Sequence, residues 1–173
     1  KITLFGSVSF HKGGEQVGGL PSRAAEALFV YLACVQKPVT REKLAELLWA
    51  DRSPTQSLTN LRTILTSLRR ELDDYLIVTR DTLAFNPEAD AFIDIFEFER
   101  GLKGLGFPDR ASSLTPTEQE TLRLTLDLYR GDFLDGFHLR DGLGFEEWSI
   151  LERERLKRLA REGFRAYTHA CLE

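Results

Sequence analysis

The hydrophobic positions in the first part of the chain change their period after a predicted hairpin. Apolar residues alternate with small or polar ones over residues 2–10, which predicts a strand, and a His-Lys-Gly-Gly turn leads into a predicted return strand over residues 15–20. From Pro21 onward, apolar residues recur at helical spacing and predict a first helix. Thr40 is the predicted N-cap of a second, short helix that ends at Trp49. The chain therefore begins with strands and continues with helices.

The longest amphipathic pattern of this part follows a loop at residues 50–54 and covers residues 55–72. One stripe of this predicted helix is made of leucines, namely Leu58, Leu61, Leu65, Leu68 and Leu72. A stripe of this kind indicates that one face of the helix is buried. Two β-rich runs on either side of a turn at Arg80 and Asp81 then predict a second hairpin over residues 76–85.

From residue 94 onward the period is helical. It predicts helices over residues 95–105, 115–129 and 144–172, and no strand pattern interrupts them. The charge changes at the same point: eleven basic and eleven acidic residues precede it, and twelve basic and sixteen acidic residues follow. We therefore predict an α+β domain over residues 1–93 and an all-α domain over residues 94–173.

The composition indicates a folded protein without membrane-spanning segments. The chain has 173 residues, 42% of them hydrophobic, which is enough for a substantial core. No apolar run reaches the roughly 20 residues of a membrane span and no leader pattern opens the chain, so we expect a cytoplasmic protein without a membrane partner. The absence of methionine indicates a segment of a longer polypeptide. The net charge of −4 argues against indiscriminate nucleic-acid binding, although binding responds to the local field.

The outward face of the predicted helix over residues 55–72 has an unusual composition. Four arginines and no carboxylate occur from Arg52 to Arg70, although Asp51 and Glu71 bracket this run. Opposite the leucines lie Gln56, Thr59, Asn60, Thr63, Thr66, Ser67 and Arg70, with Arg62 and Arg69 at the flanks. Ordinary solvated helix faces mix charges of both signs. Two helices followed by a hairpin is the order of a winged helix-turn-helix, whose second helix lies in the DNA major groove.

The residue types suggest separate roles on DNA. The candidates for reading bases are Thr59, Asn60, Thr63 and Thr66, because amides suit adenine and threonine methyl groups suit thymine. The candidates for contacting phosphates are Arg62, Arg69 and Arg70, and Arg62 could also reach guanine. Two alternatives stay open: Asn60 as a local cap or surface amide, and Arg69 as the partner of a carboxylate. Arg23, Lys37 and Arg41 could add backbone contacts near helix starts.

Two longer segments resemble a known family. The sequence PVTREKLAELLWADRSPTQSLTNLRTILTSLRREL at residues 38–72 resembles the winged-helix effector domain of OmpR-like regulators in the form carried by the SARP family. The segments LYRGDFLDGF and FEEWSILERERLKRL, within residues 128–159, resemble the bacterial transcriptional activation domain of the same family, an all-helical, tetratricopeptide-like module. Together the two resemblances cover nearly the whole chain.

The resemblance implies a sequence-specific DNA-binding transcription regulator, usually an activator that binds direct repeats of double-stranded DNA as a homodimer and contacts RNA polymerase. It further implies that the hairpin at Arg80 touches the DNA backbone or minor groove, and that the loop with Asp51, Arg52 and Ser53 lies near the polymerase. The chain departs from the family in two respects. The hairpin turn is short and carries Asp81, and the last helix ends before a family-length activation domain would, so we expect an incomplete helical module.

Other classes of function find less support. The sequence has no glycine-rich phosphate loop, no HExxH and no CxxC motif, and its histidines, His11, His138 and His169, lack ligand spacing, so we expect neither an enzyme nor a cofactor or metal. The balanced charge of residues 1–93 leaves open a protein-interaction scaffold whose winged helix does not bind DNA. In the last helix an apolar stripe is expected at Phe145, Trp148, Leu151, Leu156, Leu159, Phe164 and Tyr167, and we expect the helical domain to bind a second copy or the polymerase.

Overall fold

The computed structural model of the chain describes residues 1–17, 20–108 and 113–172. The chain forms two compact units. Unit 1 comprises Lys1–Gln16, Ala91–Phe137 and Ser149–Glu173, and unit 2 comprises Val17–Asp90 and His138–Trp148. The units are interleaved along the sequence, whereas the sequence predicts a single boundary between residues 93 and 94. That domain boundary stays a prediction.

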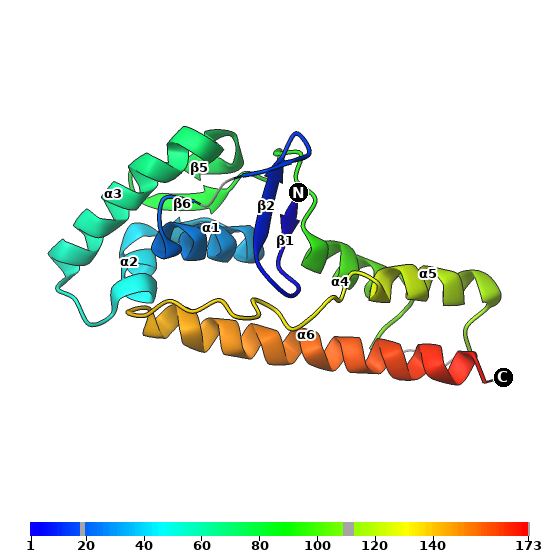
Figure 1. Cartoon of the computed structure of the whole chain (residues 1–173). Helices are drawn as coiled ribbons and strands as arrows, with labels where there is room; N and C mark the ends of the chain where they lie inside the picture. Colours follow the sequence, from blue (N-terminus) through cyan, green and yellow to red (C-terminus); the bar gives the residue numbers. More distant parts are fainter. Residues whose placement is uncertain (18–19, 109–112, 173) are drawn as a thin grey trace. The chain divides into compact units, whose positions relative to one another are not determined.

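Unit 2 combines helices with a small sheet (Figure 1). Its helices are α1 (Arg23–Val35), α2 (Arg41–Trp49), α3 (Pro54–Leu72) and the 3-10 turn η1 (Asp73–Tyr75), and its strands are β4 (Val39–Thr40), β5 (Leu76–Val78) and β6 (Thr82–Phe85). The strands pair antiparallel in the order β4-β6-β5. The predicted helices and the hairpin are confirmed, and the Thr40 hydroxyl accepts a hydrogen bond from the Lys43 amide at 3.4 Å as the predicted N-cap. The two-residue strand β4 was not predicted.

Helix α1 is the centre of unit 2. An unbroken run of seven residues, from Ala27 to Ala33, is buried, as expected of a helix that is apolar on most sides. The Phe29 ring packs against the rings of Phe85 and Tyr75, with centroid distances of 5.8 and 6.4 Å. The other helices and the sheet of this unit are arranged around this apolar centre.

The turn between α2 and α3 is fixed by side-chain hydrogen bonds. The Ser53 hydroxyl accepts from the Gln56 amide at 3.4 Å, and Pro54 occupies the first turn, where its missing N–H costs nothing. The buried Ser57 hydroxyl lies within hydrogen-bonding distance of the carbonyls of Trp49 (3.2 Å) and Ser53 (3.1 Å). These contacts hold the start of α3 against the end of α2.

The predicted leucine stripe of α3 is confirmed except at its first position. Leu61, Leu65, Leu68 and Leu72 are buried, and α3 packs against α1 and α2. Leu58 is only half-buried. The buried position in that turn is Ser57, because the helix start is turned toward the end of α2.

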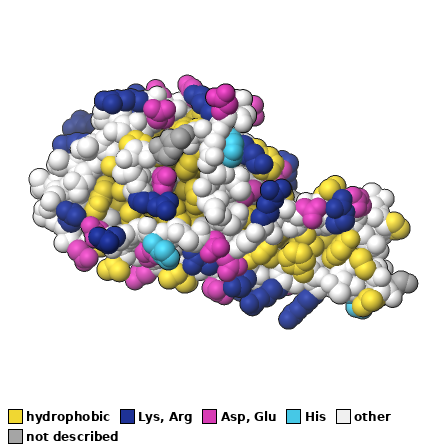
Figure 2. Space-filling model, viewed as in Figure 1, with side chains coloured by type: hydrophobic (Ala, Val, Ile, Leu, Met, Phe, Trp, Pro, Cys, Tyr) yellow, Lys and Arg dark blue, Asp and Glu magenta, His cyan; other side chains and the backbone are white. Residues whose placement is uncertain are grey.

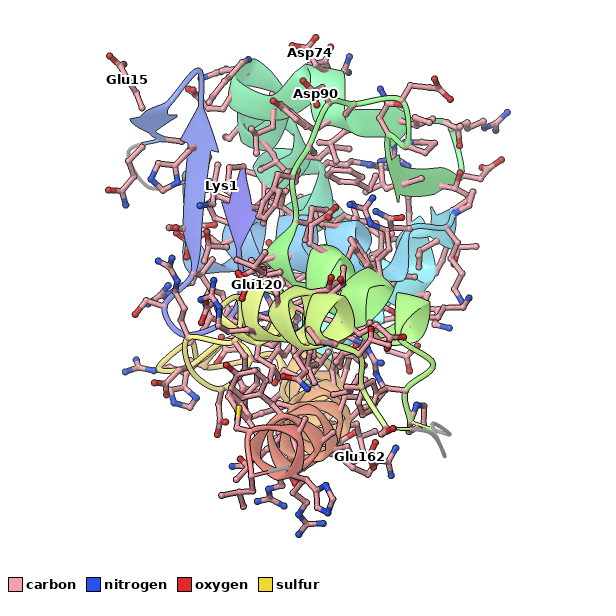
Figure 3. All side chains as sticks on the ribbon, turned by 90° about the vertical axis from the view of Figure 1, so that its right-hand side faces the viewer. Lys1, Glu15, Asp74, Asp90, Glu120 and Glu162 are labelled. Atoms are coloured by element: carbon pink, nitrogen blue, oxygen red, sulfur yellow. The ribbon has the colours of Figure 1, made fainter. Side chains whose placement is uncertain are left out.

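Unit 1 contains the strands β1 (Ile2–Thr3), β2 (Ser9–Lys12) and β3 (Glu15–Gln16), paired antiparallel in the order β1-β2-β3. Its helices are α4 (Asp94–Gly104), α5 (Pro116–Leu126) and the larger part of α6 (Leu143–Ala170), which begins in unit 2. Figure 3 shows Glu15 projecting from the end of the β2–β3 hairpin. The unit therefore joins an N-terminal hairpin to helices from the second half of the chain.

The prediction of one continuous strand over residues 2–10 is wrong. Leu4 and Phe5 are adjacent and both buried, so this segment cannot expose alternate side chains as a half-buried strand does. Gly6, with φ of 76°, turns the chain, and its amide donates to the Asp132 carbonyl at 2.9 Å. The return strand predicted over residues 15–20 is limited to β3, and its residues 18 and 19 lie outside the described part.

A buried carboxylate ties the N-terminal segment to α4. Asp94 is 3% exposed and accepts hydrogen bonds from the amides of Leu4 (2.9 Å), Phe5 (3.0 Å) and Ile95 (2.9 Å). These N–H groups would otherwise be buried without partners, which costs about 1–3 kcal/mol each. Asp94 therefore supplies the hydrogen-bond acceptors that a neighbouring strand would supply in a β-sheet.

The apolar stripe predicted for α6 is confirmed except at Leu151 and Phe164, and its residues Trp148, Leu159 and Tyr167 are half-buried. Phe145 and Leu156 are buried as expected, but Leu151 and Phe164 are 73% and 44% exposed. The buried side of the helix is completed by small residues, Ser149, Ala160 and Gly163. A Cβ at Gly163 would approach Leu126 to 2.9 Å, so the small residues allow α6 to pack closely.

We predict that Asp94→Ala lowers the free energy of unfolding by at least about 3 kcal/mol, because three buried amides lose their acceptor. Urea denaturation followed by circular dichroism measures this difference. The matched control is Asp90→Ala, which removes an exposed carboxylate and is expected to change stability by less than about 0.5 kcal/mol. Equal effects of the two substitutions would contradict the anchoring role of Asp94.

Candidate nucleic-acid interface

The outward side of α3 presents most of the predicted DNA-binding residues together. Thr59, Thr63 and Thr66 are exposed, as are Arg62 and Arg70. Asn60 is half-buried and lies on the same helix. In Figure 2 the surface in the region of α3 is mainly white, the colour of the backbone and of side chains that are neither hydrophobic nor ionisable, with dark blue basic side chains. The buried leucine stripe thus leaves a polar, cationic surface on the opposite side.

The threonines of this face use their hydroxyl protons within the helix. Thr59, Thr63 and Thr66 donate to the carbonyls of Thr55, Thr59 and Arg62, at 2.9, 3.1 and 2.9 Å. Such bonds to the carbonyl four residues earlier fix the side chain. Each threonine keeps its methyl group and the lone pairs of its hydroxyl for other contacts. That combination suits a thymine methyl group or an amino donor on a base edge.

The arginines of α3 differ in their partners. Arg69 donates through Nε to Asp73 at 2.6 Å, and this hydrogen bond, together with the negative charge of Asp73, raises the pKa of Arg69. The alternative that Arg69 pairs with a carboxylate, which the sequence left open, is therefore what the structure shows. Within the described part of the chain, neither Arg62 nor Arg70 forms a salt bridge. Asp74, which follows Asp73 in η1, projects from the ribbon just beyond the end of α3 (Figure 3).

The hairpin β5–β6 has the short turn expected from the sequence. The Thr79 hydroxyl accepts from the amides of Asp81 (3.3 Å) and Thr82 (2.9 Å), which fixes the two turn residues. The Arg80 side chain is exposed next to that of Asp81. The turn is tied to the start of α2, because the Arg41 amide donates to the Asp81 carbonyl at 3.0 Å and the Arg41 guanidinium donates to the Thr79 carbonyl at 2.9 Å.

The loop predicted to lie near RNA polymerase is exposed, and two of its three residues make contacts inside unit 2. Arg52 forms a salt bridge with Asp141 at 3.0 Å, and Ser53 caps α3. Asp51 is exposed. A cavity of about 390 Å³ lies beside this loop and is lined by Glu42, Ala45, Glu46, Trp49, Ala50, Arg52, Pro54, Ser57 and Leu58. The half-buried Leu58 therefore contributes to a surface cavity.

A groove of about 470 Å³ runs beside the second half of α3. It is lined by Arg41, Arg62, Leu65, Thr66, Arg69, Arg70, Asp73 and Val78. The sequence offered Arg41 only as one of several basic residues near helix starts. Its place beside α3 depends on the sheet pairing that brings β6 next to β4, which no local pattern predicts.

Comparisons with known proteins support the fold. No protein-family model and no curated protein matches the chain. Its structure is similar to that of Mycobacterium tuberculosis EmbR in complex with a low-affinity phosphopeptide, with a TM-score of 0.68 and 20% sequence identity. The chain has an EmbR-like fold. The match covers 92% of this chain and 43% of the EmbR chain, so the chain spans less than half the length of EmbR.

At this level of identity the likeness shows the fold: a mixed α+β part with small sheets, followed by a helical region. No described helix has the length and apolarity needed to cross a membrane. Among the described residues, no group of three or more histidine, cysteine or acidic side chains could hold a metal ion.

We predict that Arg70→Ala weakens binding to every duplex by a similar factor, about tenfold at low salt. It should also reduce the slope of log affinity against log salt by about 0.9, because one phosphate contact is lost. Binding titrations at several salt concentrations measure both quantities. A changed base preference with an unchanged salt slope would show that Arg70 contacts bases.

We predict that Thr63→Ala relaxes the preference at one base position and leaves the salt slope unchanged, because it removes a methyl group and a hydroxyl from the outward face without changing charge. Selection of duplexes from a random pool with each protein measures the preference. Thr121→Ala is the matched control, since the Thr121 hydroxyl also donates to the carbonyl four residues earlier, at 3.0 Å, on an exposed side of α5. Identical profiles for wild type and Thr63→Ala would exclude the base-reading role.

Proposed function

We propose that the chain is a sequence-specific DNA-binding transcription regulator in which α3 enters the major groove. The observation that carries this proposal is the exposed side of α3, where threonines and arginines stand together and no carboxylate occurs before Glu71. Base edges and phosphates are the partners that this set of donors, acceptors and methyl groups fits. The resemblance to the SARP family and the similarity of the fold to that of EmbR support the same function.

The elements around α3 fit this mode of binding. Helix α2 and the Ser53 and Ser57 hydrogen bonds hold the start of α3, so the outward side chains project from a rigid support. In this proposal Arg62 and Arg70 contact phosphates, Thr59, Asn60, Thr63 and Thr66 lie toward the bases, and Arg80 on the β5–β6 turn contacts the neighbouring backbone. Arg69 contributes less, because Asp73 neutralises it.

The helical part is proposed to mediate contacts with other proteins. In the family that the sequence resembles, a pair of molecules binds direct repeats and activates transcription through RNA polymerase. For this chain we propose the loop at Asp51, Arg52 and Ser53 as the polymerase contact and helices α4 to α6 as the surface for a second copy. Hydrophobic side chains exposed there, such as Leu124 at 54% and Phe164 at 44%, offer apolar area for such a contact. Figure 2 shows yellow hydrophobic side chains in the region of α5 and the C-terminal part of α6.

Selection from a random duplex pool, followed by binding of the selected duplex at rising salt, tests the proposal. We expect a selected sequence, and a slope of log affinity against log salt of about −4 to −5 for each bound chain, from four to six phosphate contacts. A protein-interaction scaffold, the alternative left open by the balanced charge of the N-terminal part, would select no sequence and show little dependence on salt. That outcome would overturn the proposed function.

A further inference from the structure

The groove beside α3 has an unusual balance of charge. Four guanidinium groups line it, from Arg41, Arg62, Arg69 and Arg70, against one carboxylate, from Asp73. The carboxylate is engaged by Arg69 at 2.6 Å. Three arginines therefore line the groove without a carboxylate partner in the described structure, and an anion is the ligand that their charge favours.

Arg41 provides an independent sign of a missing acceptor. Its guanidinium donates to the Thr79 carbonyl at 2.9 Å, but its Nε atom is buried and has no hydrogen-bond partner among the described residues. A buried charged donor without an acceptor costs free energy, and a ligand oxygen that this donor meets after a small movement of the side chain would offset that cost. The two hydrogen bonds of Arg41 to the β5–β6 turn also hold this residue in place before any ligand arrives.

The lining identifies the class of anion. Guanidinium groups bind phosphate oxygens with two parallel hydrogen bonds, and the Thr66 hydroxyl is a further polar group on the same side. Leu65 and Val78 add apolar surface to the groove. A bare inorganic anion has no apolar part to place there, whereas a phosphodiester carries a sugar on each side.

We propose that this groove binds one phosphodiester of the DNA backbone, with Arg41, Arg62 and Arg70 around the phosphate and the adjoining sugar against Leu65 and Val78. The inference rests on the proposed function and adds a specific anchor to it. A phosphate held between α3 and the hairpin sets the register in which the base-reading threonines meet the sequence. Asp73 limits the charge of the groove by pairing with Arg69.

Neutral methylphosphonate linkages, placed one at a time in the selected duplex, test the anchor. A methylphosphonate at one position of the duplex is expected to lower the affinity of the wild-type protein about tenfold. The same linkage is expected to cause no further loss of affinity in Arg62→Gln or Arg41→Gln, because the phosphate contact is already lost in these variants. The control is Arg100→Gln, which removes an exposed guanidinium paired with Glu97 on α4 and should respond to each linkage as the wild type does. Equal losses for all four proteins at every position would overturn the anchor while leaving DNA binding intact.

Inorganic phosphate, compared with chloride at equal ionic strength, tests the groove without DNA. Phosphate is expected to shift the Nε–H resonances of Arg41 and Arg62 in the wild type and to leave that of Arg100 unchanged. Arg62→Gln, which alters an exposed side chain and preserves the Arg41 contacts, should abolish the shift at Arg41. Absence of a selective shift overturns the groove as a phosphate site. If phosphate binds in this way but no duplex is selected, the groove stands as a phosphate site while its assignment to DNA and the proposed function both fail.

Discussion

Burial of the leucine stripe of α3 against α1 and α2 decides which side chains of that helix reach solvent. Because the helical period is fixed, placing Leu61, Leu65 and Leu68 inside leaves the threonines and arginines on the outside. The Ser53 cap and the buried Ser57 hydroxyl fix where the helix begins relative to α2. The candidate interface is thus a consequence of core packing, and it would turn inward if the stripe moved by one residue.

Local charge explains how an acidic chain can present a cationic surface. The chain carries a net charge of −4, yet the groove beside α3 has four arginines and one aspartate. Beyond about 8 Å, exposed charges are largely screened at physiological salt, so the sum over the whole chain matters little to a ligand at α3. The salt bridge between Arg69 and Asp73 compensates one of the four positive charges of this groove. The unpaired positive charge of the groove therefore belongs to Arg41, Arg62 and Arg70.

Local patterns predicted the elements of unit 2 well, because each helix there has its own cap and its own apolar spacing. Thr40 and the leucines of α3 are examples in which a local signal and the packing agree. The strand predicted over residues 2–10 failed because Leu4 and Phe5 are held by Asp94, a residue 90 positions away from Leu4. No short-range pattern contains that information.

The same limit applies to the last helix and to the groove. On α6, Leu151 was wrongly expected to be buried, because small residues such as Ser149 and Ala160 complete the buried side of the helix and permit close approach there. In the candidate site, the residues of α3 were predictable from one helix wheel. The role of Arg41 was not predictable, because two long-range contacts place this residue beside α3: the pairing of β4 with β6, and its hydrogen bond to the Thr79 carbonyl in the β5–β6 turn.

Threonine methyl resonances report directly on whether the outward side of α3 contacts duplex DNA. Thr59, Thr63 and Thr66 can be compared with Thr121 and Thr168, which are also exposed on helices and also bond the carbonyl four residues earlier. We expect a duplex that carries one copy of the selected site, and so binds one chain, to shift the methyl signals of the three α3 threonines and to leave those of Thr121 and Thr168 in place. Shifts confined to Thr121 and Thr168, or no shift on α3 while the duplex is bound, would contradict it.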